Sequence, residues 1–455
     1  MTINQKSAVK VYEGRWATKP EKVKEGILFS YYSPYAREVY ISGDFNGWKQ
    51  GATPLIKGND DVWRLIMTLP SGRWYDYKFI VDGKWITDPN NPDLNPDTAG
   101  DANSVIYLGK SGELLAGDDP GRHVFSPEGR NIRRGRFESP KYSRSFEFFY
   151  ILPEGQDKSN LPVIICLNNY IKSQRIHEYC KKYGYIGIMP SPELGRDYLR
   201  LGKVDTFSEL LDYLKNSFKI DDDRIYVTGM SNGGLEAMLV SMYYPDLIAA
   251  SGLVFGPYRL RYYKKRIKDM NPPELRNFIN SLDFPEKMIA NLENLPLYIS
   301  HGGDDEAVPV DDAIVLHEMT EKLGGPAKFK YYPEEGHTWL MVDKDLPEIF
   351  DWFGRHTRVR FPKYIHYTAP SGIFKNTIYW AEFTAADIRG PVKVFVEPAG
   401  KYILKVEIEN ISKLILKPLR EFVKISDKLK IETNIEASNI DFDKVANEAV
   451  ITFGC

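Results

Sequence analysis

Apolar strand-like segments and amphipathic helix-like segments alternate between residues 146 and 356. The segments FEFFYIL, LPVIICL, YIGIMP and RIYVTG are short and almost continuously apolar, which is typical of strands buried on both faces of a sheet. Between them lie helical patterns such as DTFSELLDYLKNSF, in which the apolar residues fall on one helical face. Because parallel strands need a crossover connection, this alternation predicts an α/β fold with a largely parallel sheet covered on both faces.

The regions on either side have a β-rich pattern. Residues 26–107 contain short alternating strands separated by the turn signals GDFNG, LPSG and VDG, at the spacing of a small immunoglobulin-like β-sandwich. Strand patterns such as PVKVFVE and YILKVEIEN return after about residue 362. We therefore predict four segments, which are a β-sandwich at 1–109, a linker at 110–140, an α/β domain at 141–358 and a β-rich domain at 359–455.

The α/β region also contains an insertion at 257–294, with the basic and aromatic run YRLRYYKKRIK. Two interpretations stay open for this insertion. It is either a lid over a binding site or a helix whose charged face is solvated.

The charge balance argues against partners that bind through a strong overall field. Sixty basic and 62 acidic residues leave a net charge of −2, so we expect no nucleic-acid or membrane partner. The three cysteines, Cys166, Cys180 and Cys455, have no metal-ligand spacing, and we expect no metal or cofactor. The chain begins without a secretory signal pattern and contains no long apolar run. We expect a cytoplasmic protein, or a secreted one if a leader was removed.

The segment GMSNG, residues 229–233, has the G-x-S-x-G spacing of a nucleophile elbow. It stands between a strand pattern, RIYVT, and a helix pattern, GLEAML, so it would hold Ser231 in a tight turn. A serine hydroxyl needs an imidazole base that a carboxylate orients. Small-residue turns between strand and helix also occur without catalysis, so the partners decide the interpretation.

Both partners follow later strands in the order that this kind of fold requires. The loop SHGGDDEAVP offers three carboxylates, Asp304, Asp305 and Glu306, after the strand pattern LPLYIS. The turn YPEEGHTW offers His337 after the next strand pattern. The order serine, acid, histidine predicts a catalytic triad.

The residues of this region resemble the α/β-hydrolase superfamily. DDRIYVTGMSNGG, the acid loop and the GHTW turn are similar to the esterase branch that includes feruloyl esterases, acetylxylan esterases and polyhydroxyalkanoate depolymerases, over residues 146–356. The resemblance implies that Ser231 is the nucleophile and that His337 is the general base and acid. It implies Asp305 as the acid of the triad, with Asp304 as the alternative.

One departure from the esterase pattern concerns the oxyanion hole. The family usually has a His-Gly pair after the strand that corresponds to LPVIICL, whereas this chain has Asn168 and Asn169. One oxyanion donor is expected to be the backbone N–H of Asn232, which follows the nucleophile. The second is expected to be the N–H of Asn169 or of Tyr170.

The N-terminal segment resembles the glycogen-binding module of AMP-activated protein kinase β subunits, carbohydrate-binding module family 48. VYISGDFNGWKQGATPL, SGRWYDYKFIVDGKWITDP and GDANSVIYLG carry the resemblance over residues 26–107. It implies an α-glucan platform made by Trp48, Lys78, Trp85 and Asn103, because a sugar ring can stack on an indole. The alternative is a spacer whose tryptophans are part of its core.

Together these patterns predict a serine carboxylic ester hydrolase that removes acyl or feruloyl groups from carbohydrate through an acyl-enzyme. The expected partners are an acylated carbohydrate substrate and an α-glucan at the N-terminal module. Two alternatives stay open. One is a serine peptidase similar to prolyl oligopeptidase, and the other is a glucan-binding protein with little catalytic activity.

Overall fold

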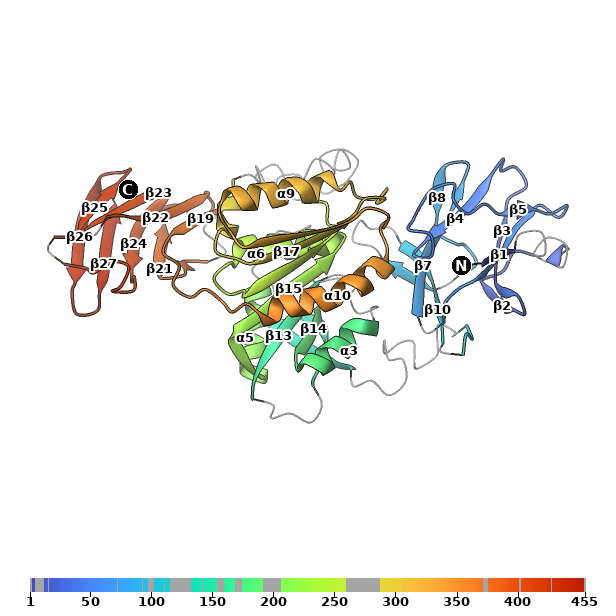
Figure 1. Cartoon of the computed structure of the whole chain (residues 1–455), viewed down its shortest axis with the longest axis horizontal. Coiled ribbons are helices and arrows are strands. Elements are labelled where there is room, and N and C mark those ends of the chain that lie inside the picture. Colours follow the sequence, from blue (N-terminus) through green and yellow to red (C-terminus); the bar gives the residue numbers. More distant parts are fainter. Residues whose placement is uncertain are drawn as a thin grey trace.

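The computed structural model places three bodies in a row (Figure 1). An N-terminal β-sandwich and a C-terminal β-rich body lie on opposite sides of a central α/β body. The described residues are 2–4, 12–14, 16–71, 73–91, 93–96, 102–109, 111–114, 132–141, 143–153, 159–167, 174–190, 206–258, 287–370, 375–400, 402–426 and 428–453. Within these ranges, no helix is both long enough and apolar enough to cross a bilayer.

The N-terminal body is a sandwich of two antiparallel sheets. One sheet has the order β1-β6-β3-β2 with β5 beside β6, and the other has the order β4-β7-β10-β9 with β8 beside β7. Their bounds are β1 Thr2–Asn4, β2 Glu21–Val23, β3 Gly26–Tyr32, β4 Val39–Gly43, β5 Ile56–Lys57, β6 Val62–Thr68, β7 Arg73–Val81, β8 Lys84–Ile86, β9 Leu94–Pro96 and β10 Ala102–Leu108. Alternate residues such as Phe29, Leu65 and Phe79 fill the space between the sheets, since side chains alternate along a strand. The predicted sandwich is confirmed.

The central body is built on an eight-stranded sheet of order β11-β12-β14-β13-β15-β16-β17-β18. The first three strands of this order pair antiparallel, and the strands from β14 to β18 pair parallel. The strand bounds are β11 Ile132–Ser139, β12 Arg144–Ile151, β13 Ser159–Leu167, β14 Ile186–Pro190, β15 Lys219–Met230, β16 Ala250–Val254, β17 Leu297–Gly302 and β18 Ala327–Tyr332. The predicted α/β-hydrolase fold is confirmed.

Helices cover both faces of this sheet, as the continuous apolar strands predict. Alternate strand residues point to opposite faces, so that Ile165 joins one hydrophobic cluster and Ile164 joins the other. The first cluster also contains residues of α5, α6 and α9, and the second contains residues of α3 and α10. The helix bounds are α3 Gln174–Tyr183, α5 Thr206–Ser217, α6 Asn232–Tyr243, η2 Ile289–Leu292, α9 Asp311–Lys322 and α10 Trp339–Gly354.

The structure corrects the predicted linker and bears on one of the two interpretations of the insertion. Part of the segment 110–140, predicted as a linker, is the edge strand β11, which pairs with β12 along its whole length. The last part of the 257–294 insertion is not a lid, because η2 buries Ile289 and Leu292 in the core. Residues 259–286 of the insertion lie outside the described ranges.

The C-terminal body is a second pair of sheets, with the orders β19-β22-β23-β25 and β20-β21-β24-β27-β26. The strand bounds are β19 Ile365–Ala369, β20 Thr377–Ile378, β21 Ala381–Ala385, β22 Val392–Gly400, β23 Ile403–Glu409, β24 Ile411–Leu416, β25 Lys430–Thr433, β26 Ala437–Asp443 and β27 Glu448–Phe453. Inward residues such as Val394, Leu404 and Leu414 are fully buried. The predicted β-rich domain is confirmed.

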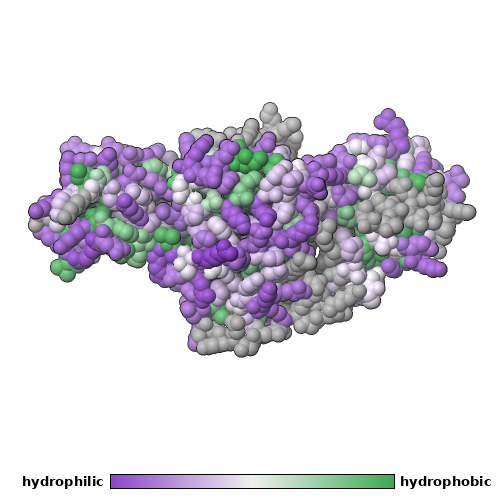
Figure 2. Space-filling view, viewed as in Figure 1, coloured by the Kyte–Doolittle hydropathy of each residue, from purple (hydrophilic) through white to green (hydrophobic). Residues whose placement is uncertain are grey.

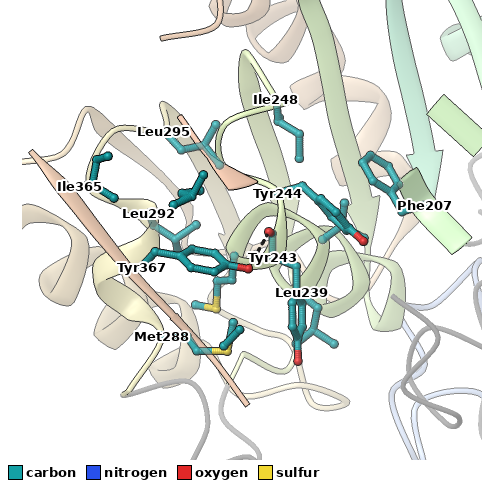
Figure 3. Close-up of a cluster of buried hydrophobic side chains, with 14 of the residues drawn as sticks. Phe207, Leu239, Tyr243, Tyr244, Ile248, Met288, Leu292, Leu295, Ile365 and Tyr367 are labelled. Atoms are coloured by element: carbon teal, nitrogen blue, oxygen red, sulfur yellow. Dashed lines mark hydrogen bonds between the residues drawn. The ribbon is translucent and has the colours of Figure 1, made fainter. Parts of the chain in front are cut away.

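An apolar contact joins the C-terminal body to the central one. Tyr367 on β19 packs against side chains of α6 and η2, and its hydroxyl donates a 3.3 Å hydrogen bond to the carbonyl of Tyr243 (Figure 3). Asn291 on η2 completes the contact by binding both backbone groups of Thr368 at 2.8 and 2.9 Å. The two bodies therefore share one continuous core.

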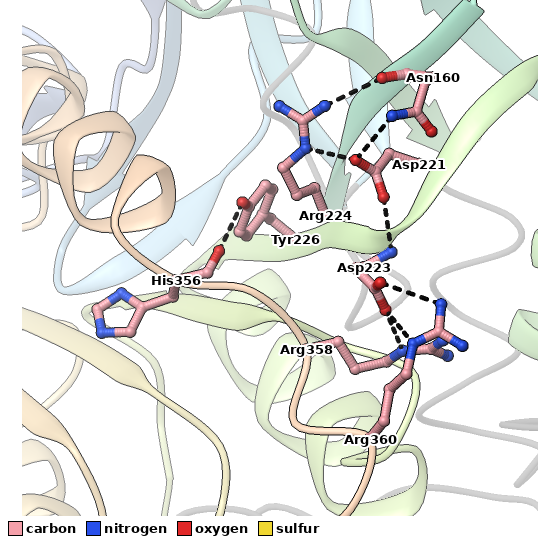
Figure 4. A network of polar contacts seen from close by, with 8 residues as sticks. All are labelled: Asn160, Asp221, Asp223, Arg224, Tyr226, His356, Arg358 and Arg360. Atoms are coloured by element: carbon pink, nitrogen blue, oxygen red, sulfur yellow. Dashed lines mark hydrogen bonds and ion pairs between the residues drawn. The ribbon is translucent and has the colours of Figure 1, made fainter.

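Charged side chains fasten the start of β15 to the chain that follows α10. Asp223 accepts hydrogen bonds from Arg358 and Arg360, and Asp221 accepts one from Arg224 at 2.6 Å (Figure 4). Among the described residues seen in Figure 2, hydrophilic ones predominate on the surface and apolar ones form small separate groups.

Candidate active site

Ser231 lies in the turn between β15 and α6, as the elbow pattern predicts. It caps α6 with φ 54° and ψ −124°, a backbone conformation that costs free energy for any residue with a side chain. Its backbone N–H donates a 2.9 Å hydrogen bond to the carbonyl of Val254, at the end of β16. A Cβ atom on Gly229 would lie 1.9 Å from the carbonyl oxygen of Gly233, so the turn closes only with glycine at that position.

Asp305 and His337 lie side by side on the loops that follow β17 and β18. His337 Nδ1 is 2.7 Å from Asp305 Oδ2. The other carboxylate oxygen accepts the backbone N–H groups of Ala307 and Val308 at 2.9 and 2.8 Å, which fixes the carboxylate in its loop. Since a carboxylate only accepts, His337 donates through Nδ1–H, and its Nε2 is left available as the base.

The environment of Asp305 keeps it ionised. Burial by itself would raise the pKa of this carboxyl. The charge of His337 and hydrogen bonds from His301, His337 and the Val308 N–H outweigh burial, so the pKa lies well below its usual value. The buried negative charge of Asp305 stabilises the imidazolium that forms when His337 acts as a base.

The end of β16 links this pair to the serine turn. Val254 accepts the hydrogen bond from Ser231, and the next residue, Phe255, packs its ring 4.4 Å from the ring of His337, centroid to centroid. Phe255 is itself held by a 2.8 Å bond from its N–H to the carbonyl of Ser300. The three residues predicted as a triad thus lie at the carboxyl ends of neighbouring parallel strands.

The other predicted residues of this site are the alternative acid and the oxyanion donors. Asp304, the alternative acid, is half exposed and pairs with Lys49 of the sandwich at 3.0 Å. Asn232 is the first residue of α6. Asn169 and Tyr170, the candidates for the second oxyanion donor, lie outside the described residues, as does Asn168.

The predicted glucan platform lies on the outer face of one sandwich sheet. The ring centroids of Trp48 and Trp85 are 6.0 Å apart, and Trp85 is 38% exposed. Lys78 shares this face, because Trp85 pairs with Ile80, two residues along β7. Asn103 also faces outward, since its neighbour Ser104 is buried opposite Tyr77. Unlike the tryptophans, Lys78 is buried, with only 5% of its surface exposed.

Sequence reasoning missed three residues that shape this region. Phe255 packs on His337, and Asp44 accepts the indole N–H of Trp48 at 3.1 Å. Lys49 connects the sandwich to the acid loop. For Lys49 and Asp44 the available signal is their position on either side of Trp48, within the segment GDFNGWK.

Glu236, one turn into α6 from the serine, is a buried carboxyl without a hydrogen-bond partner among the described residues. Burial raises its pKa to about 8. Each unit of difference between the folded and the unfolded pKa corresponds to about 1.36 kcal/mol of unfolding free energy. The carboxyl of an unfolded glutamate ionises near pH 4.3. Between these two values only the folded protein holds the proton, so the stability of the native protein falls as pH rises through this window.

Glu236→Gln removes this titration. Between pH 4 and pH 8 the native protein loses stability that the variant keeps. We therefore expect the free energy of unfolding of the variant, minus that of the native protein, to rise by roughly 3 to 5 kcal/mol over this range. Urea unfolding at pH 4, 6 and 8 measures this difference. A difference that does not change with pH would contradict the assignment of a neutral Glu236.

Metal ligands are not gathered at this site or elsewhere in the part of the chain that the structure describes. No group of three or more His, Cys, Asp or Glu side chains there could hold a metal ion.

Two family descriptions match parts of the chain. Residues 28–113 match the glycogen recognition site of AMP-activated protein kinase, and residues 191–360 match the prolyl oligopeptidase family. The first match includes the tryptophan platform, and the second includes all three residues of the predicted triad.

Curated relatives match separate parts in the same way. The AMP-activated protein kinase subunit beta-2 of Mus musculus is 41% identical over 80 residues, 18% of this chain and 28% of the relative. An uncharacterized secreted protein of Arthroderma benhamiae is 26% identical over 245 residues, 50% of this chain and 26% of the relative. The chain thus spans little more than a quarter of the length of these relatives.

Solved structures resemble the chain over longer stretches at low identity. An enterochelin esterase from Shigella flexneri covers 77% of this chain with 98% of its own length, at 14% identity and a TM-score of 0.47. A ferulic acid esterase covers 49% of this chain with 98% of its own length, at 15% identity and a TM-score of 0.39. Within this one chain, a segment similar to a glycogen-recognition module therefore precedes a segment in the α/β body that is similar to the prolyl oligopeptidase family.

Proposed function

We propose that the protein is a serine esterase that removes acyl groups from carbohydrate. The observation that carries this proposal is the 2.7 Å contact between His337 Nδ1 and Asp305 Oδ2, beside the strand end that holds the Ser231 turn. A glycogen-recognition module in the same chain supports a carbohydrate as the alcohol part of the ester. The acyl group, acetyl or feruloyl, follows from the resemblance to the esterase branch.

In the proposed mechanism, Ser231 Oγ attacks the ester carbonyl carbon while His337 Nε2 takes the hydroxyl proton. Asp305 holds the imidazole in the tautomer that leaves Nε2 free and stabilises the imidazolium. The tetrahedral oxyanion accepts hydrogen bonds from the backbone N–H of Asn232 and from that of Asn169 or Tyr170. The C–O bond to the sugar then breaks, and His337 returns the proton to the departing sugar oxygen.

Water completes the turnover in the second half of the reaction. His337 takes a proton from the water molecule, the hydroxide adds to the acyl carbon, and the bond to Ser231 Oγ breaks as the oxygen regains the proton. The products are the carboxylic acid and the free serine. No metal or cofactor takes part in the proposed steps.

A serine peptidase is the second candidate, and the match of residues 191–360 to the prolyl oligopeptidase family favours it. The two candidates differ in the bond that is cleaved, so one comparison separates them. We expect the native protein to release p-nitrophenol from p-nitrophenyl acetate and butyrate, with little release of p-nitroaniline from succinyl-Gly-Pro p-nitroanilide. Faster cleavage of the anilide than of the two esters would show that the protein is a peptidase rather than an esterase.

The third candidate is a glucan-binding protein with little catalytic activity, and the Asn168–Asn169 pair motivates it. The loss of one oxyanion donor typically lowers turnover about 10² to 10³-fold. If the native protein hydrolyses neither the esters nor the anilide, this candidate is favoured. We also propose α-glucan as a ligand of Trp48 and Trp85, because the apolar face of a sugar can stack on an indole and these two rings lie 6.0 Å apart.

The location of the protein stays a proposal as well. We propose a cytoplasmic location, with secretion as the alternative because the name of the Arthroderma benhamiae relative describes a secreted protein. Immunodetection in cell and medium fractions separates these two locations.

A further inference from the structure

One loop of the N-terminal sandwich touches both loops that carry the acid and the histidine. Lys49 Nζ is 3.0 Å from Asp304 Oδ2, next to Asp305 in the chain. A Cβ atom on Gly47 would lie 3.3 Å from Thr338 Cγ2, and one on Gly336 would lie 3.7 Å from Gly47 Cα. Gly336 and Thr338 are the two neighbours of His337, so the sandwich loop packs directly against the histidine turn.

The glycine contact is more informative than the ion pair. Lys49 and Asp304 are partly exposed, and ion pairs of this kind contribute little to stability. Gly47 and Gly336, in contrast, bring two backbones close together. A Cβ atom on Gly336 would be in ordinary van der Waals contact with Gly47, and one on Gly47 would approach the Thr338 side chain tightly. In Figure 1 the sandwich accordingly lies beside the end of the central body at which α10 begins.

The touching loop is internally fixed. Asn46 Oδ1 accepts the Gly43 N–H at 3.0 Å, and Asn46 Nδ2 donates to Thr53 Oγ1 at 2.8 Å. Gly47 and Trp48 both have positive φ, 68° and 60°, which produces a sharp turn. The Trp48 indole N–H donates to Asp44, so the ring of Trp48 is oriented by the same loop that contacts the histidine turn.

Trp48 therefore lies close to the catalytic residues. Its Cα atom is within about 13 Å of the Cα atom of His337, because each lies one residue, about 3.8 Å, from the touching glycines. Trp85 extends the platform, with its ring 6.0 Å from that of Trp48. A short oligosaccharide is long enough to cover this span.

We infer that Trp48 and Trp85 form the site that holds the sugar part of the same ester molecule that Ser231 cleaves. The inference rests on the proposed esterase function and makes it more specific. The substrate class is an acylated short oligosaccharide, whose sugar stacks on the platform while its acyl carbonyl reaches the serine. The sandwich is then one wall of the active site, and it does more than tether the enzyme to an insoluble glucan.

The test compares a substrate with the sugar and one without it. For Trp48→Ala and for Trp85→Ala, we expect kcat/KM on mono-acetylated maltotriose, divided by kcat/KM on p-nitrophenyl acetate, to fall at least tenfold. The fall is expected in KM rather than in kcat, because the platform holds sugar and does not touch the reacting atoms. Trp85 is partly exposed on a short strand, so its truncation provides a variant that keeps the fold if Trp48→Ala does not.

Trp16→Ala is the matched control. Trp16 belongs to the same sandwich and is 80% exposed, but its ring packs on Tyr32 of the other sheet. We expect both kinetic constants of Trp16→Ala to equal those of the native protein.

Each outcome of this test has one meaning. An unchanged ratio in both platform variants, with reduced retention on immobilised glycogen, would mean a remote tether and would overturn the inference while leaving the esterase intact. A ratio that falls equally in Trp16→Ala would also overturn it. If the native protein hydrolyses neither ester, the proposed function itself fails.

Discussion

Ser231→Ala is expected to lower kcat for p-nitrophenyl acetate by about 10⁴ to 10⁶-fold. The alanine variant lacks the oxygen that forms the acyl-enzyme, and loss of a triad nucleophile in other serine hydrolases has effects of this size. Alanine keeps the Cβ atom, so the strained φ of 54° and the packing of the turn stay the same. We therefore expect an unchanged midpoint of thermal unfolding.

The unfolding midpoint is the control for this variant, because a misfolded protein would also be inactive. Initial rates measured by p-nitrophenol release, with the native protein at matched concentration, give the comparison. A Ser231→Ala variant that folds normally and retains more than about a tenth of the native kcat would show that another group is the nucleophile.

Asp305→Asn is expected to lower kcat by about 10⁴-fold, the size known for the corresponding change in a serine protease. The side-chain amide of the variant could donate toward His337, which would favour the imidazole tautomer with its proton on Nε2, where it cannot accept the serine proton. The variant would also lose the buried negative charge that stabilises the imidazolium. The native fold of the loop survives, since the side-chain oxygen can still accept from Val308.

Glu306→Gln is the matched control for this prediction. Glu306 is the next residue in the same loop, is exposed, and is a carboxylate that also becomes an amide. We expect its kcat to stay within about twofold of the native value. Equal losses in both variants would mean that the loop as a whole, and not the carboxylate beside His337, supports activity.

The fold of the central body could be predicted because its signals are local. Strands buried on both faces must be apolar throughout, and the helices between them must have one apolar face, so each element can be recognised in its own segment. Ser231 could be predicted for the same reason, since the glycines around it are required by contacts within the turn itself. The serine, acid and histidine order follows from the parallel sheet, which brings the ends of successive strands to one edge.

The edge strand β11 was missed because an edge strand has a different pattern. Its segment IRRGRFES contains three arginines and a glycine, and charged residues such as Arg136 and Glu138 are exposed, which protects an edge from pairing with another chain. Gly135 lies under the ring of Phe148, where a Cβ atom would collide with it. Gly135 is therefore required by packing within a strand.

The contact between sandwich and histidine turn could not be predicted from sequence patterns. Lys49 and Asp304 are 255 residues apart and belong to different bodies, so neither local composition nor periodicity connects them. The burial of Glu236 is similar, because a single glutamate in a helical pattern is normally assigned to the solvated face. Both depend on how complete bodies pack.

The most direct test of the central claim, that Ser231 is the activated nucleophile of a serine hydrolase, is mass spectrometry after treatment with a fluorophosphonate. We expect one phosphonyl group per chain, located on the peptide that contains Ser231, and no such adduct in Ser231→Ala. A native protein that stays unlabelled, or an adduct on another residue, would show that Ser231 is not the activated nucleophile.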